Sequence, residues 1–337
     1  MKRIGMLTSG GDCQALNAAM RGVVKGLSEN VDELEVYGFL NGYKGLIYGD
    51  YRLLTSAGFS GILTKGGTIL GSSRQPFKQM RVPDANGLDK VEAMKATYHK
   101  LNLDCLVILG GNGTQKTANL LREEGLNIIH LPKTIDNDLV LTDHTPGYGS
   151  AARYVAASVR EIALDASVYQ QKSVTIVEIM GRHAGWLTAA SALARKEAGD
   201  NPLLIYLPEA PFELAQFNDD LKKAFEKTAN VIVCVSEGIR DHGGRFICEY
   251  STEAQVDTFG HKMLAGCGKI LENYIRNQFG VKVRSVELNV NQRCSGLTVS
   301  ATDLNEAEMA GRFGVQAALD SHTGYRLRYR SSASGCC

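Results

Sequence analysis

Several features that would assign this chain to a common class are missing from its 337 residues. No apolar run is long enough to cross a membrane, and the apolar stretch at the start is too short for a signal peptide. No CxxC pair or Cys/His metal spacing occurs, and the eight cysteines are scattered, as reduced core thiols of a cytosolic protein are. These absences predict a cytoplasmic protein with no membrane segment.

An excess of either charge is also missing. The 37 basic and 36 acidic residues leave a formal net charge of +1, which argues against a nucleic-acid or other polyanionic partner. The apolar fraction of 44% is ordinary for a globular protein. The length corresponds to about two domains, each large enough to bury its own core.

Strand patterns and helix patterns alternate along the chain. Strands are expected at 3–8, 34–40, 104–109, 126–131, 173–180, 203–207 and 230–236. Helices are expected at about 16–27, 88–101, 150–170, 183–195, 212–227 and 304–319, with another that ends near 122. Repeated βα units predict an α/β fold with two doubly wound domains and mainly parallel sheets. A domain boundary is expected near 145–147.

The run PKTIDND, residues 132–138, combines two carboxylates, a hydroxyl and a lysine within seven residues. It follows a strand pattern, and ligands of open α/β sheets bind at the carboxyl ends of strands. Asp136 and Asp138 are two residues apart, so in an extended loop they would point the same way. One could accept a proton while the other holds a cation or a water, and Lys133 and Thr134 can meet an anion. This inventory suits phosphoryl transfer; the alternative is an Asx-rich turn that caps a helix.

Three glycine-rich loops also follow strand patterns: SGGD at 9–12, GGTILGSSR at 66–74 and GGNGT at 110–114. Glycine lets the backbone approach phosphate oxygens, and a helix that begins there offers free N–H donors. None of the loops has the Walker A ending or the dinucleotide GxGxxG spacing. Each alone is compatible with an ordinary βα turn, but together with PKTIDND they favour a phosphate-binding site.

These motifs, in this order, resemble those of 6-phosphofructokinases of the bacterial type. The set is SGGD with NAAMR at 17–21, GGTILGSSR, GGNGT, PKTIDND, and MGRHAGW at 180–186, and the resemblance covers residues 1 to about 320. It implies transfer of a phosphoryl group to the 1-hydroxyl of fructose 6-phosphate, giving fructose 1,6-bisphosphate in glycolysis, in a cleft between two domains. It also implies a donor-binding domain at 1–147, completed by 292–330, and a sugar-binding domain at 148–291.

The resemblance also implies roles for single residues. Asp136 matches the general base, Thr134 lies near the transferred phosphoryl group, and Asp138 lies near the sugar and the metal. Gly11 matches backbone beside the donor phosphates, and Arg74 matches an arginine that offsets charge in the transition state. The remaining donor-binding positions are Lys78, Gly111, Asn112, Gly113, Thr114 and Lys133. The remaining sugar-phosphate positions are Lys172, Met180, Gly181, Arg182, Glu237, Arg284 and Arg293.

Simpler interpretations exist for some of these residues. Arg182 and Glu237 are also compatible with an ordinary ion pair, and Lys172 with a solvated surface charge. His183 is expected to start a helix or to pack rather than to act in catalysis. Because the family draws some phosphate-binding cations from a neighbouring subunit, the resemblance implies a homo-oligomer with shared active sites.

The phosphoryl donor depends on two positions. In the family, a glycine at the position of Gly113 leaves room for a nucleotide, whereas an aspartate accompanies the use of pyrophosphate. A lysine at the position of Lys133 is usual in pyrophosphate enzymes but also occurs, paired with that glycine, in a subgroup that uses ATP. The chain resembles this ATP subgroup, and a pyrophosphate-dependent enzyme is the alternative.

The chain departs from the family pattern at three places. Asn112 replaces the aspartate that commonly helps to hold Mg²⁺, so metal binding is expected to be weaker. Val290 stands where a histidine or tyrosine is usual, and Arg293 lacks the glycine pair that follows it in the family. The tail at 331–337 has the composition of a non-native or truncated end.

Two other classes of protein are considered. An inactive or regulatory protein on the same fold is one of them. Diacylglycerol and NAD kinases are the other; they share a loop like GGNGT but lack the MGRH turn.

Overall fold

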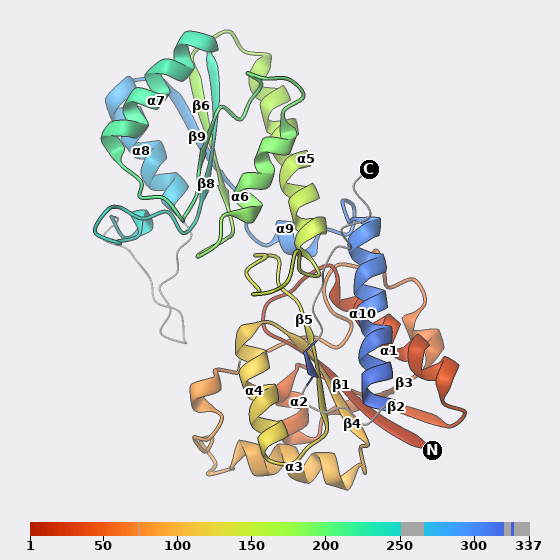
Figure 1. Cartoon of the computed structure of the whole chain (residues 1–337). Helices are drawn as coiled ribbons and strands as arrows, with labels where there is room; N and C mark the ends of the chain where they lie inside the picture. Colours follow the sequence, from red (N-terminus) through yellow and green to blue (C-terminus); the bar gives the residue numbers. More distant parts are fainter. Residues whose placement is uncertain (74, 251–265, 320–324, 327–337) are drawn as a thin grey trace. The chain divides into compact units, whose positions relative to one another are not determined.

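The chain folds into two compact units. The computed structural model describes residues 1–73, 75–250, 266–319 and 325–326. The first unit holds the described residues of 1–135, of 139–150 and from 293 onward, and the second holds those of 136–138 and 151–292. Each unit is a sheet with helices on both faces, which confirms the predicted α/β class (Figure 1).

The sheet of the first unit is parallel except at one edge. Its strand order is β10-β5-β4-β1-β2-β3, and β3 alone runs antiparallel to its neighbour β2. The strands are β1 Lys2–Ser9, β2 Leu34–Phe39, β3 Tyr51–Leu54, β4 Cys105–Gly110, β5 Ile128–Pro132 and β10 Tyr325–Arg326. Every residue of β4 is buried, as expected for an apolar strand that helices cover on both faces.

Helices cover both faces of this first sheet. They are α1 Leu16–Asn30, α2 Tyr43–Tyr48, α3 Lys90–Lys100, α4 Asn112–Glu123 and α10 Ala301–Leu319, with 3-10 turns η1 Ser56–Phe59 and η2 Phe77–Gln79. Side chains of α2, α3 and α4 pack with strand residues in one apolar cluster. Helices α1 and α10 lie side by side on the opposite face (Figure 1).

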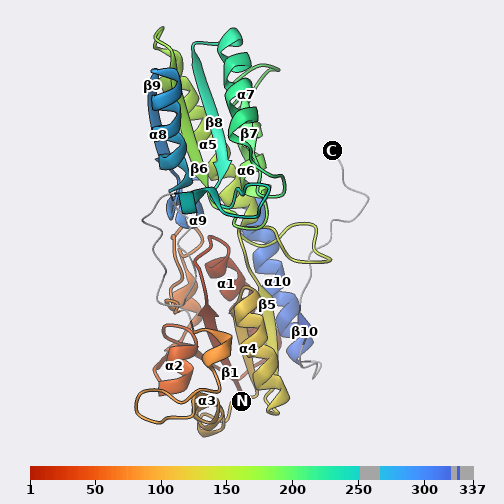
Figure 2. The same cartoon turned by 90° about the vertical axis from the view of Figure 1, so that its left-hand side faces the viewer.

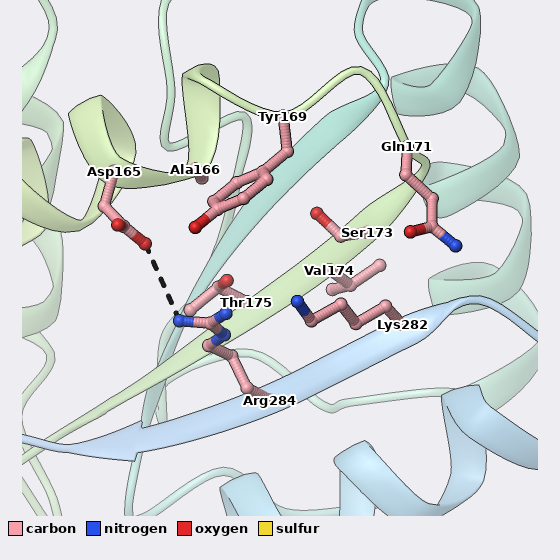
Figure 3. Close-up of a pocket in the computed structure, with 9 residues that line it drawn as sticks. All are labelled: Asp165, Ala166, Tyr169, Gln171, Ser173, Val174, Thr175, Lys282 and Arg284. Carbon is pink, nitrogen blue, oxygen red and sulfur yellow. Dashed lines mark ion pairs between the residues drawn. The ribbon is translucent and has the colours of Figure 1, made fainter.

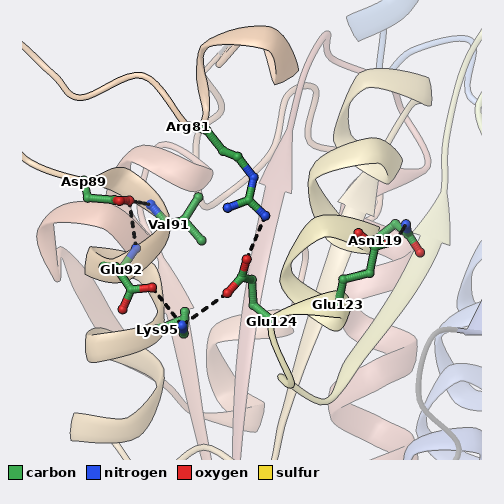
Figure 4. Close-up of polar contacts among 8 residues, drawn as sticks. All are labelled: Arg81, Asp89, Val91, Glu92, Lys95, Asn119, Glu123 and Glu124. Atoms are coloured by element: carbon green, nitrogen blue, oxygen red, sulfur yellow. Dashed lines mark hydrogen bonds and ion pairs between the residues drawn. The ribbon is translucent and has the colours of Figure 1, made fainter.

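Polar contacts tie α3 to the end of α4 (Figure 4). The Asp89 carboxylate caps α3 by accepting two N–H groups of its first turn. Glu124, which follows α4, accepts from Lys95 at 3.2 Å and from Arg81 at 2.7 Å. The Lys95–Glu124 pair is partly buried, and residues of both helices also belong to the apolar cluster of this unit.

The sheet of the second unit is wholly parallel, with the order β7-β8-β6-β9. Its strands are β6 Ser173–Ile179, β7 Leu204–Tyr206, β8 Asn230–Ser236 and β9 Lys282–Glu287. Its helical segments are α5 Tyr148–Ser167, α6 Trp186–Ala190, η3 Ser191–Ala194, α7 Leu214–Lys227, η4 Ile247–Tyr250, α8 Cys267–Phe279 and α9 Asn291–Cys294, of which α5 and α9 each have one end in the first unit. Helices α7 and α8 cover one face, and α5 and α6 cover the other (Figures 1 and 2).

Some expected elements differ from the structure. The helix predicted at 183–195 is wrong in extent, since only α6 is α-helical and η3 continues it as a 3-10 turn. The Gly185 N–H donates to the Glu209 carboxylate at 2.6 Å, which holds the chain in a turn just before α6. After α10, residues 325–326 pair with β5 as β10, a strand that the sequence had not indicated. The predicted non-native tail at 331–337 lies outside the described residues.

Two glycines bring the backbones of α1 and α10 into contact. A Cβ atom on Gly22 would lie 2.0 Å from the carbonyl oxygen of Glu308, and one on Gly311 would lie 2.2 Å from that of Ala19. Real Cβ atoms do not approach that closely. Any larger residue at these positions must therefore separate the helices.

Gly22→Ala is expected to destabilise the chain by about 1–3 kcal/mol through overpacking. This outcome opposes helix propensity, by which alanine would favour the helix by about 1 kcal/mol. The control is Gly26→Ala on the same helix, where the nearest atom, Cα of Arg312, would be 3.3 Å away, so a smaller loss is expected. Urea unfolding midpoints compare the two variants, and a midpoint for Gly22→Ala above wild type would contradict close packing.

Candidate active site

The SGGD loop follows β1 and is held by side-chain hydrogen bonds. Gly10 has a φ of +91°, a conformation that favours glycine. The Ser72 hydroxyl donates to the Gly10 carbonyl at 2.6 Å, and the Thr114 hydroxyl donates to the Ser9 carbonyl at 3.2 Å. The loop is thus tied to both of the other glycine-rich segments.

Two cations lie beside Gly11. A Cβ atom on Gly11 would lie 3.6 Å from Nη1 of Arg293 and 3.8 Å from Nζ of Lys133. Lys133 directly follows β5, its N–H donates to the Gly110 carbonyl at 3.1 Å, and only 8% of it is exposed. A backbone that approaches two cations without a side chain of its own suits an anionic ligand such as phosphate. The structure therefore places Arg293, predicted at the sugar phosphate, beside the predicted donor loop.

Asp12 adds one carboxylate to this cationic region. Burial raises the pKa of Asp12. A hydrogen bond from the Cys13 N–H and the positive charges of Lys133 and Arg293 lower it in part. Its Oδ1 is buried and has no hydrogen-bond partner among the described atoms. A buried carboxylate oxygen without a donor suits a bound cation.

The GGNGT loop begins α4 and leaves its first turn open. Gly111 is the N-cap and offers no side-chain hydrogen bond, so the first N–H groups of the helix are not capped by a side chain. Gly110 packs against Thr114, which a Cβ atom would approach to 2.5 Å. Asn112 and Gly113 are exposed, and a Cβ atom on Gly113 would meet nothing within 4 Å.

The PKTIDND loop is not extended, which corrects the expectation that Asp136 and Asp138 point the same way. Asn137 between them is in the left-handed region at a φ of +56°, so the alternation of an extended chain does not apply. Asp136 is half-buried and Asp138 is exposed. The Thr134 carbonyl accepts from the Thr145 hydroxyl at 2.6 Å, which holds the start of the loop.

In the second unit, the MGRH turn lies at the carboxyl end of β6. Gly181 has a φ of +133°, and a Cβ atom there would lie 2.4 Å from the Ala184 carbonyl oxygen. The Gly181 N–H donates to Glu237 at 3.3 Å, and its carbonyl accepts from the Ser236 hydroxyl at 2.6 Å. The Met180 N–H donates to Gln292 at 3.3 Å.

These contacts link the carboxyl ends of β6 and β8, which are neighbouring strands of the second sheet. Arg182 also lies there, because a Cβ atom on Gly238, the residue after Glu237, would lie 2.1 Å from the Arg182 carbonyl oxygen. The structure therefore brings together four predicted sugar-binding residues: Met180, Gly181, Arg182 and Glu237.

The sequence did not indicate Arg240, which lies at the same edge. Its guanidinium donates to Nδ1 of His183 at 2.9 Å and lies 4.1 Å from the centre of the Phe246 ring. The pKa of His183 is lowered chiefly by burial and further by the positive charges of Arg240 and Arg182. The negative charge of Asp138 acts to raise it. Nothing in the local sequence distinguishes Arg240 from a surface arginine.

The cations predicted at the sugar phosphate are not gathered in one place. Lys172 Nζ lies 5.5 Å from the centre of the Phe225 ring, over α7. Arg284, on β9, pairs with Asp165 of α5 at 3.6 Å in a pocket that Lys172 does not line (Figure 3). Of the cations predicted at the phosphoryl donor, Lys78 is exposed on η2, and Arg74 lies outside the described residues.

Few protein side chains are available to bind the metal that the resemblance implies. The described residues contain no group of three His, Cys, Asp or Glu side chains that could hold an ion. Mg²⁺ usually takes one or two protein oxygens and completes its shell with phosphates and waters. The unpaired Asp12 oxygen and the exposed Asn112 amide fit such an ion, provided that it binds together with the phosphates.

Within the described ranges, no helix has both the length and the apolar character needed to cross a bilayer. Five of the eight cysteines (Cys13, Cys105, Cys234, Cys248 and Cys267) are free and buried, as predicted for core thiols.

Glycine-rich turns beside cations, at the carboxyl ends of parallel strands, define a protein that binds phosphorylated ligands. The phosphofructokinase family model matches residues 3–318, so the chain belongs to the phosphofructokinase family. This confirms the resemblance seen in the sequence. Phosphofructokinases are glycolytic transferases, and the membership supports phosphofructokinase activity.

The relatives differ in their phosphoryl donor. The chain is 40% identical to an ATP-dependent 6-phosphofructokinase of Spirochaeta thermophila, over 94% of this chain and 83% of that one. It is 36% identical to a pyrophosphate–fructose 6-phosphate 1-phosphotransferase of Amycolatopsis methanolica, over 98% and 91%. The crystal structure of a pyrophosphate-dependent phosphofructokinase from Marinobacter aquaeolei matches with a TM-score of 0.80 at 27% identity, over 96% of this chain and 77% of that one.

Proposed function

We propose that the chain transfers a phosphoryl group from ATP to the 1-hydroxyl of fructose 6-phosphate. The observation that carries the choice of ATP is the open first turn of α4, where Gly113 has no neighbour within 4 Å of its Cβ position. An uncapped helix start with free space beside it suits the phosphate chain of a nucleotide.

In this proposal the first unit binds the donor. The Gly11 backbone, Lys133 and the first turn of α4 bind the phosphates, while Asp12 and Asn112 would hold Mg²⁺. When bound, Mg²⁺ would neutralise part of the phosphate charge. The donor-binding region corresponds to 1–147 with 292–330, and the sugar-binding region to 148–291.

The reaction itself is assigned to the PKTIDND loop. Asp136 accepts the proton of the 1-hydroxyl, Thr134 lies near the transferred group, and Asp138 lies near the sugar. Arg182 of the MGRH turn and the nearby Glu237 bind the sugar at the carboxyl ends of the strands of the second sheet. Arg74 keeps its proposed role in offsetting charge, on the family match alone.

Pyrophosphate is the second candidate donor. It is supported by Lys133, because a lysine at this position is usual in the family's pyrophosphate enzymes, and by relatives named for that donor. A regulatory protein without activity is less well supported, because the sequence contains both Asp136 and Arg74.

Asp136→Asn is expected to lower kcat by about 100- to 10,000-fold while the KM for fructose 6-phosphate changes little, since proton acceptance is a transition-state role. The control is Asp143→Asn, which removes an exposed carboxylate a few residues further along the same segment. Steady-state assays with a saturating donor measure both. A variant that keeps more than about a tenth of wild-type kcat would remove Asp136 from the role of base.

Gly113→Asp is expected to lower kcat/KM for ATP by about 100-fold or more, because the carboxylate repels the phosphates at short range. Pyrophosphate turnover should change less, because pyrophosphate has no third phosphate to collide with. The open space around Gly113 allows the side chain without a clash, so the fold should be kept, and Gly113→Ala controls for size without charge. Wild-type turnover with pyrophosphate and none with ATP would overturn the choice of donor.

The sugar-binding residues of the second unit lie near both ends of its sheet. Arg284 pairs in register with Thr175 of β6, and Met180 lies five residues further along that strand direction. At about 3.3 Å per residue the separation is about 16 Å, longer than a sugar monophosphate. Two copies of the chain that supply one group each would shorten the distance that the ligand and the side chains have to span, which agrees with an oligomer with shared sites.

An Asp136→Asn protein mixed with an Arg284→Ala protein should therefore regain activity. Each hybrid oligomer then contains some sites that carry both substitutions and other sites that carry neither, and the latter are intact. Each variant carried alone through the same dissociation and reassembly is the control. Verified hetero-oligomers that remain as inactive as their parents would show that each site is made by one chain.

A further inference from the structure

A pocket in the second unit has a lining that suits a phosphate monoester (Figure 3). Its floor is the edge of the sheet, where Ser173 pairs in register with Lys282 and Thr175 with Arg284. Residues two apart on a strand face the same side, so Lys282 and Arg284 point into the pocket together. This pocket lies on the face of the sheet that α5 covers, since Asp165 of α5 lines it.

The charges of the pocket leave it one positive charge in excess. Lys282 and Arg284 supply two cations, and Asp165 supplies one carboxylate. Lys282 Nζ lies 5.3 Å from the centre of the Tyr169 ring, so an aromatic face rather than a carboxylate supports it. A phosphate with two negative charges matches these two cations better than the single carboxylate does, and a guanidinium can bind it with two hydrogen bonds.

The pair between Arg284 and Asp165 is suited to displacement. Its atoms are 3.6 Å apart, and the two side chains are 49% and 60% exposed. Exposed pairs of this kind contribute little stability. Asp165 therefore occupies the guanidinium weakly, and a phosphate competes with it for the same donors.

Lys172 is differently placed. Its ammonium lies over Phe225 of α7, which belongs to the apolar cluster on the other face of the sheet. A phosphate held by Arg284 thus has Lys282 as its neighbouring cation.

We propose that Lys282, rather than Lys172, binds the 6-phosphate of the sugar together with Arg284, and that Asp165 competes with this phosphate for Arg284. The proposal rests on the proposed function for the identity of the sugar phosphate. It assigns substrate affinity to two residues, Lys282 and Asp165, that the motifs do not contain.

The test is the Kd for fructose 6-phosphate, measured by titration calorimetry on the whole chain without a donor. Lys282→Gln should weaken binding about tenfold or more, as expected for a lost charge-assisted hydrogen bond. Lys172→Gln should change the Kd less than about twofold, and Asp165→Asn should tighten binding by up to about threefold. Lys222→Gln, an exposed lysine of α7, controls for the loss of one positive charge.

Two further measurements separate a binding role from a structural one. Lys282→Arg should restore much of the affinity, and inorganic phosphate should compete with fructose 6-phosphate less well in Lys282→Gln than in wild type. A larger loss in Lys172→Gln than in Lys282→Gln, or weaker binding in Asp165→Asn, would overturn the proposal. A wild-type chain that binds fructose 6-phosphate but turns over neither ATP nor pyrophosphate would instead refute the proposed function and leave this assignment standing.

Discussion

The first unit depends on a positive charge that is held inside the protein. Lys133 is almost fully buried at the end of β5, and Arg293 lies beside the same glycine. Burying an ammonium group is costly unless nearby negative charge compensates for it. Asp12 supplies one such charge; its own burial raises the pKa of its carboxyl group, whereas Lys133 and Arg293 act to lower that pKa. In the proposed function, a phosphate chain bound at Gly11 adds negative charge beside these two cations.

Parallel strands explain why the chemistry gathers where it does. In both units the glycine-rich and charged turns follow the carboxyl ends of neighbouring strands, where the sheet leaves room for a ligand. The second unit adds a cationic pocket partway along β6 and β9, away from its carboxyl edge. The separation of these two places along β6 agrees with the proposal that two copies of the chain share a sugar-phosphate site.

Local patterns in the sequence predicted β1, β2 and β4 to β8, but not β3, β9 or β10. The unbroken apolar run of β4 and the helical spacing of Phe217 and Leu221 in α7 both indicated their elements correctly. The direction of single side chains was not predictable in the same way. Asn137 takes a positive φ and turns the PKTIDND loop. Lys172, Lys282 and Arg284 occupy positions set by strand register, which depends on pairing partners far along the chain.

The most direct test of this account is a crystal structure of the chain with a non-hydrolysable ATP analogue and Mg²⁺. The account predicts that the terminal phosphates lie within hydrogen-bond distance of the Gly11 backbone and of Lys133 Nζ, with the α-phosphate beside Gly113. It also predicts that Asp12 or Asn112 contributes an oxygen to the metal. A phosphate chain bound away from Lys133, or an analogue that does not enter the first unit, would contradict it.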